Sequence, residues 1–114
     1  MKLSEHFDSS EFACKCGCGF DTPDKKLIDL LQEIRTRIGK PVIINSGCRC
    51  ESHNHNVGGS TRSQHVQGKA ADIRSSVSPD EISYVANEIL GDQGGVKAYE
   101  TFCHVDVRDW YWRG

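Results

Sequence analysis

The sequence contains no long hydrophobic run and no excess of basic residues. No stretch reaches the roughly 18 consecutive apolar residues that indicate a membrane-spanning helix. The 14 Lys and Arg residues and 16 Asp and Glu residues give a net charge of −2, so the basic footprint of a general DNA- or RNA-binding protein is missing. The first residues also lack the apolar core of a secretory signal, and we expect synthesis in the cytoplasm without a signal peptide.

Neither an internal repeat nor a linker interrupts the chain. Its 114 residues fit one compact domain, and 37% hydrophobic residues make it too apolar for a disordered protein. We therefore expect a single domain over residues 1–114, and we expect the protein to be a monomer. Its first part, residues 1–21, is predicted to be an irregular arm that carries cysteine and phenylalanine residues.

Two segments have the start signals and the apolar periodicity of helices. Thr22-Pro23-Asp24 offers a capping hydroxyl and an early proline, and Leu and Ile recur at helical spacing over residues 23–38. Ser78 and Glu81 have the spacing of a capping box, ahead of a second apolar face that ends at Gly91. The sequence thus predicts two helices.

Four short apolar segments have the character of strands: 42–44, which should be buried, 70–73, and the predicted hairpin of 96–99 and 102–107. The segment 45–68 is rich in Gly, Ser, Asn and His without periodicity, which predicts a long functional loop. The expected fold class is α+β, with two helices packed on a small, mainly antiparallel sheet.

His65, Asp72 and His104 form the pattern with the clearest chemistry. His65 precedes Asp72 by seven residues, and His104 lies on a predicted strand that could pair beside Asp72. Two imidazoles and one carboxylate leave one position of a tetrahedral zinc ion open, as in catalytic sites. Spacing alone also allows three ordinary polar residues, because no local ligand pair such as HExxH is present.

Three separated motifs follow one another in a specific order. They are Ile44-Asn45-Ser46-Gly47-Cys48-Arg49 with Asn56-Val57-Gly58-Gly59, then Ser63-x-His65-x-x-Gly68-x-Ala70-x-Asp72, and finally His104-Val105-Asp106. Together they resemble the zinc D-Ala-D-Ala carboxypeptidases of peptidase family M15, over about residues 12–108. The similarity is greatest to the short branch related to the C-terminal domain of a secreted actinomycete carboxypeptidase and to bacteriophage endolysins. It implies the α+β fold shared with the Hedgehog signalling domain.

The resemblance also implies roles for individual residues. His65, Asp72 and His104 would hold zinc. Arg49 would face the cleft and pair with a substrate carboxylate or a developing oxyanion, for which an Arg fork is well suited; the alternative is a solvated surface charge. Ser63 and Gln64 would orient the metal-binding His or the peptide. Three glycines (Gly58, Gly59 and Gly68) resemble turn residues that need positive φ or close backbone approach.

The sequence departs from the family pattern at the residue that transfers protons. Better-known members carry an acid three residues before the last His ligand, or a His two residues before it, where this chain has Thr101 and Phe102. Glu100 and Asp106 are the remaining candidates. Asp106 projects from the same strand face as His104, so it could accept a proton or orient a ligand. The sequence leaves these alternatives open.

Six cysteines fall into two clusters and one single residue. The clusters are Cys14, Cys16 and Cys18, and Cys48 and Cys50; in a reducing compartment, four or five of these thiolates could hold a second, structural zinc. A disulfide between the clusters, or simple burial of some of them, is the alternative. Cys103 should point away from His104 into the core. We expect His53 and His55 to be solvated or to face substrate.

The function that the resemblance implies is that of a zinc metallopeptidase. It would hydrolyse peptidoglycan stem or cross-link peptides, as a D,D-carboxypeptidase or as an endopeptidase of the endolysin type, on the cell wall after phage lysis or tail delivery. A catalytically impaired zinc-containing module that binds peptidoglycan or a partner is the alternative. The acidic balance disfavours a cysteine-based nucleic-acid module.

Overall fold

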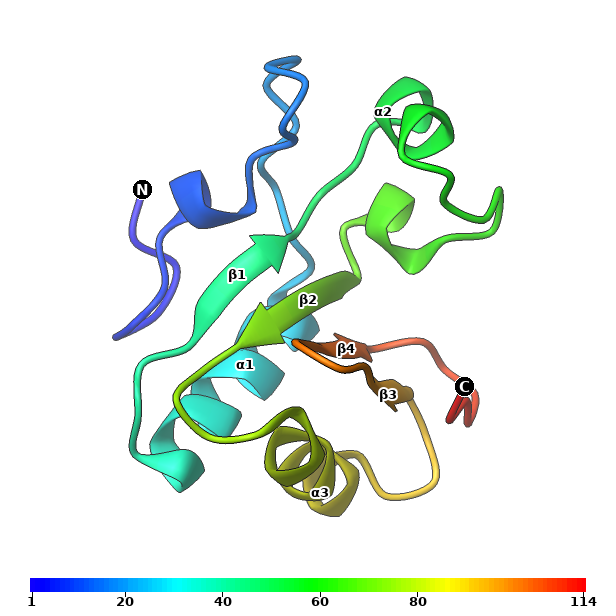
Figure 1. Cartoon of the computed structure of the whole chain (residues 1–114). Helices are drawn as coiled ribbons and strands as arrows, with labels where there is room; N and C mark the ends of the chain where they lie inside the picture. The colour runs from blue at the N-terminus through cyan, green and yellow to red at the C-terminus, as the bar shows by residue number, and fades with distance from the viewer.

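A four-stranded antiparallel sheet lies at the centre of the structure, a computed structural model that describes residues 1–114 (Figure 1). Its strands are β1 (Ile43–Ser46), β2 (Ala70–Arg74), β3 (Gly95–Ala98) and β4 (Cys103–Asp106), in the order β1-β2-β4-β3. The hairpin of β3 and β4 is confirmed. Because β2 and β4 occupy the centre, residues on them are held by ladders on both sides.

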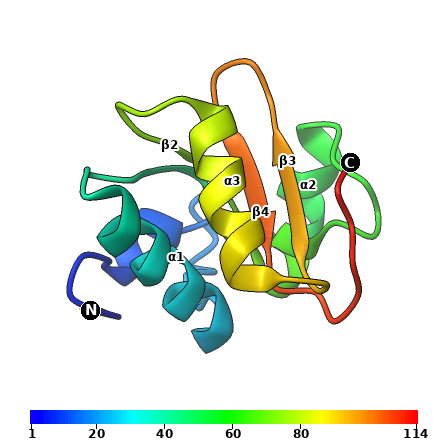
Figure 2. The same cartoon turned by 90° about the horizontal axis from the view of Figure 1, so that it is seen from below.

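Two long helices cover one face of this sheet. They are α1 (Lys25–Ile38) and α3 (Pro79–Leu90), which lie in front of the strands in Figure 2. The periodic apolar positions of both helices pack against the core, as the sequence predicts, although on α3 only Ile82 and Ala86 are fully buried. Ser78 begins α3, since its hydroxyl accepts the N–H of Glu81 at 3.1 Å. The predicted α+β class is confirmed.

The start of α1 differs from the prediction. Asp24, not Thr22, is the N-cap, and its carboxylate accepts the N–H of Lys26 at 2.8 Å. The N–H of Asp24 donates to the carbonyl of Gly68, which keeps Thr22 and Pro23 outside the helix. A tertiary contact therefore decides where this helix begins.

A third helix, α2 (Glu51–Asn56), lies within the segment that was predicted to be a loop. The two predicted helices, α1 and α3, are confirmed, and α2 is a further helix that the sequence did not predict. This helix is polar along its length, so it lacks the apolar periodicity by which α1 and α3 were recognised. It begins at Cys50, whose sulfur accepts the N–H of His53 at 3.3 Å.

The first strand is less buried than the sequence predicts. β1 lies at an edge of the sheet, so Ile43 has 44% of its surface exposed. The core instead takes side chains from the N-terminal arm, since Phe7 and Phe12 are both buried against it. A short 3-10 turn over Ser9–Phe12 orders this part of the arm.

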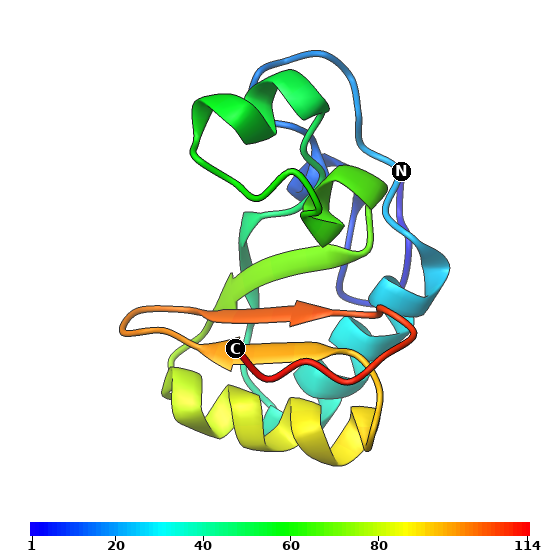
Figure 3. The same cartoon turned by 90° about the vertical axis from the view of Figure 1, so that its right-hand side faces the viewer.

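The other side of the molecule carries α2 and a 3-10 turn over Gln64–Gln67, away from α1 and α3 (Figure 3). They lie where β1 ends and β2 begins, beside the tip of the N-terminal arm (Figure 1). None of the helices has the length and hydrophobicity that crossing a membrane requires.

Candidate metal centre and its cleft

The register of the two central strands places Asp72 directly opposite His104. His65 joins them from the 3-10 turn that leads into β2. One ligand atom from each of the three side chains lies within 4.8 Å of the others. The pairing predicted between the strand of Asp72 and that of His104 is confirmed.

The ring of His65 is oriented by a backbone carbonyl. Its Nδ1 lies 2.8 Å from the oxygen of Gly47, which can only accept a hydrogen bond, so Nδ1 carries the proton. The unprotonated Nε2 then faces Oδ1 of Asp72 at 3.3 Å. The turn that holds this ring begins at Ser63, whose hydroxyl accepts the N–H of His65, and ends at Gly68 with φ +71°.

The ring of His104 is oriented by a carboxylate. Its Nε2 lies 2.8 Å from Oδ2 of Asp106, and its Nδ1 lies 3.0 Å from Oδ1 of Asp72. With the proton on Nε2, the lone pair of Nδ1 points to the same carboxylate oxygen as Nε2 of His65. In that tautomer the three atoms could hold a cation, and a second partner for each His is typical of zinc sites.

Hydrogen bonds within the candidate metal centre shift the pKa values of His104 and Asp72. Burial would lower the pKa of His104, but hydrogen bonds with Asp106 and Asp72 outweigh it and raise the pKa above its ordinary value. Burial would raise the pKa of Asp72, but hydrogen bonds from His104 and His65 hold it below its usual range. In the absence of a metal ion, a proton on His104 therefore takes the place of the cation.

Asp106 lies behind His104 and is fully buried. Besides His104, it accepts the backbone N–H of Arg108 at 3.1 Å and two guanidinium N–H groups of Arg108 at 2.8 and 2.7 Å. Burial would raise the pKa of Asp106, but the bonds from His104 and Arg108 hold it low. All of its contacts turn it toward His104 and Arg108 rather than toward the cleft.

A cleft of about 490 Å³ opens over His65, Asp72 and His104. Its wall includes Arg49, Ser63 and Gln64, which sequence reasoning had singled out, and does not include Glu100 or Asp106. The other lining residues are Val57, Gly58, Gly59, Ser60, Arg62, Tyr99, Phe102, Arg108 and Trp112. Asp72 is the one carboxylate in this wall, so three guanidinium groups make the cleft positively charged.

Arg49 is held in place by three acceptors. Its guanidinium donates to Oγ of Ser46 at 3.1 Å, to Oδ1 of Asn54 at 3.2 Å and to Oδ2 of Asp72 at 3.4 Å. Asn54, on α2, also donates to the carbonyl of Ser60. A side chain on Gly59 would collide with Asn54, so the close approach predicted for this glycine is confirmed.

Several residues of the cleft were missed by sequence reasoning. Asn54 lies in the polar helix that had no recognisable pattern, and Arg108 follows the last motif. Trp112 ends a run of three aromatic residues near the C-terminus, and its N–H and C=O pair with Gly94 and Val96 beside β3. Tyr99 stacks on Phe102 with ring centroids 4.6 Å apart. Glu100 lies between these two and is exposed.

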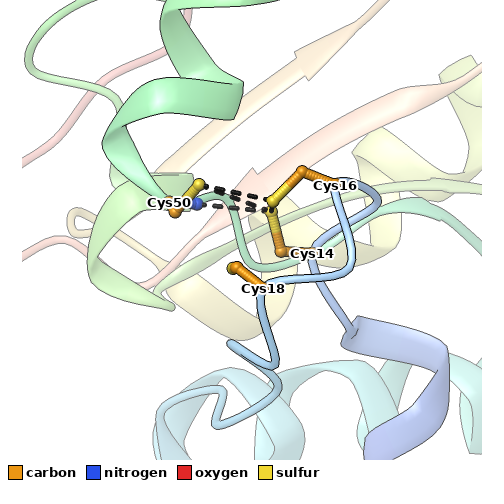
Figure 4. A group of neighbouring side chains, drawn as sticks. All are labelled: Cys14, Cys16, Cys18 and Cys50. Carbon is orange, nitrogen blue, oxygen red and sulfur yellow. Dashed lines mark hydrogen bonds between the residues drawn. The ribbon is translucent and has the colours of Figure 1, made fainter.

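The cysteines that lie together in the structure are not the two clusters seen in the sequence. Cys14, Cys16, Cys18 and Cys50 form a second group whose sulfurs lie within 4.8 Å of one another (Figure 4). Cys48 is not part of this group and belongs to the hydrophobic core instead. Cys103 is fully buried, as predicted, and all six thiols are free. Of the loop histidines, His53 is half-buried and His55 is exposed on α2.

Comparison with known proteins places the chain in a family. Curated protein sequences give no significant match. The family model for Peptidase M15 matches residues 5–106, which include the arm, both predicted helices and all three residues of the candidate metal centre. The chain therefore belongs to peptidase family M15, a family of zinc peptidases.

Proposed function

We propose that this protein is a zinc metallopeptidase that hydrolyses stem or cross-link peptides of peptidoglycan. The observation that carries the proposal is the convergence of two imidazole nitrogens and one carboxylate oxygen at the base of an arginine-lined cleft. Three ligands from one side leave the cleft side of the ion for water and substrate, as catalytic zinc requires.

His65, Asp72 and His104 would hold the zinc ion. When bound, zinc supplies Lewis acidity that polarises a peptide carbonyl and lowers the pKa of water. Asp106 keeps a proton on Nε2 of His104, and Gly47 keeps one on Nδ1 of His65, so that both rings offer their other nitrogen. Asp106 thus acts as a positioning residue.

The charge of the cleft favours an anionic peptide. Arg49, Arg62 and Arg108 surround the ligands, and a guanidinium recognises a carboxylate through paired hydrogen bonds. Peptidoglycan stem peptides end in a carboxylate and carry further carboxylates along their length. Arg49 retains two N–H groups beyond its three protein contacts, and we assign these to the terminal carboxylate or the developing oxyanion. Ser63 and Gln64 contribute to the same wall.

Glu100 is the proton-transferring group that we propose. It lies in the β3–β4 turn between Tyr99 and Phe102, both of which line the cleft, so a bound peptide passes next to it. It forms no ion pair or hydrogen bond that would hold it elsewhere. A carboxylate at this rim can take a proton from water and return it to the leaving amine.

A binding module is the second candidate function. The observation that favours it is the absence of a carboxylate other than Asp72 from the cleft wall. Such a module would hold wall peptides or a partner through Arg49 and zinc without turnover.

The deciding experiment incubates zinc-loaded protein with purified muropeptides and follows the products by mass spectrometry. New fragments that are absent with His104→Ala would support the peptidase, and their masses would identify the bond. Glu100→Gln should keep its zinc and lose most of the turnover. Bound zinc with no fragments from any muropeptide would select the binding module.

The place of action follows from the substrate. We propose that the protein acts as a monomer on the cell wall after its release by phage lysis or tail delivery, and that it binds no nucleic acid. Lysis of cells from outside by the purified protein would support this, whereas salt-sensitive DNA or RNA binding would contradict it.

A further inference from the structure

We propose that Cys14, Cys16, Cys18 and Cys50 bind a structural zinc ion that fastens the N-terminal arm to the start of α2. This site is separate from the candidate catalytic centre, and its argument does not depend on peptidase activity. The four cysteines come from two segments of the chain that are more than 30 residues apart in sequence, yet their sulfurs share one small volume (Figure 4).

The distances between the sulfurs match a tetrahedral zinc site. Sγ of Cys14 lies 3.5 Å from that of Cys16 and 3.9 Å from that of Cys50, and the sulfurs of Cys16 and Cys50 are 3.6 Å apart. With zinc–sulfur bonds of about 2.3 Å, the edges of a regular tetrahedron measure about 3.8 Å. A disulfide would need about 2.05 Å, so these separations fit three thiolates around one ion, and the sulfur of Cys18 lies within 4.8 Å of the other three.

The backbone is shaped to bring three thiols of the arm together. Gly17 has φ +82°, a conformation that favours glycine, and its N–H donates to the carbonyl of Cys14 at 3.1 Å. The N–H of Cys14 donates to the carbonyl of Phe20 at 2.8 Å, which closes the loop at its base. This folding turns Cys16 and Cys18 back toward Cys14.

Backbone N–H groups point at two of the sulfurs. The N–H of Cys50 lies 3.4 Å from Sγ of Cys14, and the N–H of His53 lies 3.3 Å from Sγ of Cys50. Such donors stabilise the negative charge of thiolates that bind a metal.

Core packing does not account for this group. Cys16 and Cys18 are exposed, and exposed cysteines gain no burial energy from lying together. Four soft thiolates suit zinc and would fill all four of its positions, which leaves no open site for a substrate. The ion is therefore structural.

The proposed ion supports the wall of the cleft. Cys50 is the N-cap of α2 and directly follows Arg49, and α2 carries Asn54, which holds the guanidinium of Arg49. On the other side, the N–H of Cys48 donates to the carbonyl of Phe12 in the arm. Zinc at the four cysteines would therefore connect the arm to the loop that carries Arg49.

The test is metal stoichiometry combined with cobalt spectroscopy on the full chain. Protein purified under reducing conditions should contain two zinc ions, and Cys16→Ser and Cys18→Ser should each reduce this to one. Because both side chains are exposed, these changes leave the core intact. The matched control is Cys48→Ala, which removes a cysteine next to the group but outside it, and should keep both ions.

Cobalt distinguishes the two sites. In His104→Ala, added Co²⁺ should still give the intense thiolate-to-cobalt charge-transfer absorption, and Cys16→Ser should abolish it. The proposal would be overturned if the four thiols of the group were free in wild-type protein supplied with Co²⁺ and no thiolate–cobalt absorption appeared. A disulfide among these cysteines in reduced, metal-supplied protein would also overturn it, and would be seen as an intact mass two hydrogens below that of the fully reduced chain.

Discussion

Gly95 lies directly opposite Asp106 in the β3–β4 ladder, and the Asp106 carboxylate fills the space that a side chain at position 95 would take. A methyl group at position 95 would overlap both carboxylate oxygens. The glycine on β3 is therefore what allows a buried aspartate to stand behind His104 on β4.

Gly95→Ala should weaken metal binding without touching a ligand. Displacing Asp106 removes the partner of Nε2 of His104, and loss of such a partner reduces zinc affinity about 10- to 100-fold. Competition with a chromophoric chelator measures this affinity. Lys97→Ala, on the same strand, should leave it unchanged, and equal losses in both variants would point to general damage to β3.

The free energy of unfolding of the metal-free protein should decrease toward both acidic and alkaline pH. The pKa of Asp72 and that of Asp106 are lowered in the folded state, so their stabilisation is present above the ordinary value of 3.8 and is lost as the pH falls. The pKa of His104 is raised, so its stabilisation is present below the ordinary value of 6.5 and is lost as the pH rises through the folded value. Urea unfolding should therefore find maximum stability between these two pH values.

Zinc should remove the alkaline decrease in this profile, because the cation replaces the proton on His104. His104→Ala should remove it as well, in the absence of metal. An alkaline decrease that persists in the variant would mean that another group causes it.

Arg49→Lys should impair recognition of a peptide carboxylate. A lysine cannot reproduce the fork that contacts Ser46, Asn54 and Asp72 while also donating to substrate. Loss of a charge-assisted pair predicts a decrease of about 10- to 100-fold in kcat/KM, mainly through KM. Arg74→Lys, outside the cleft, is the control, and a peptide with an amidated terminus should show little difference between wild type and Arg49→Lys.

Ile82→Ala should destabilise the fold far more than Tyr84→Ala. Both residues lie on α3, but Ile82 is fully buried whereas Tyr84 is 66% exposed. Removing a buried isoleucine costs about 2–5 kcal/mol, and an exposed residue away from special contacts costs about 0.5 kcal/mol. Denaturant unfolding of the two variants compares these free energies directly, and similar values would contradict the burial of this face.

Cys103 should be the slowest cysteine to react with an alkylating agent. Burial, followed by the charge of Asp72, raises the pKa of Cys103 to about 12, so almost no thiolate exists at pH 8. Cys18 is exposed and should react well before Cys103 once metal is removed. Peptide mass spectrometry after timed alkylation gives the order, and early labelling of Cys103 in folded protein would contradict its place in the core.

Much of this protein was determined by the sequence alone. The apolar faces of α1 and α3, the hairpin of β3 and β4 and the pairing of Asp72 with His104 follow from local periodicity and from motifs in order. The helix faces and the hairpin depend on residues close together in the chain, whereas the pairing of Asp72 with His104, which are 32 residues apart, was indicated by the order of the motifs.

Tertiary structure decided the rest. The polar helix α2 exists because Cys50 caps it and Asn54 packs under Arg49, and no periodicity announces either contact. Asp106 faces His104 because Arg108 and Gly95 enclose it from the other sides. Cys50 joined the arm while Cys48, two residues earlier, entered the core. Each of these outcomes depends on which distant residues the fold brings into contact, and local sequence carries no record of such contacts.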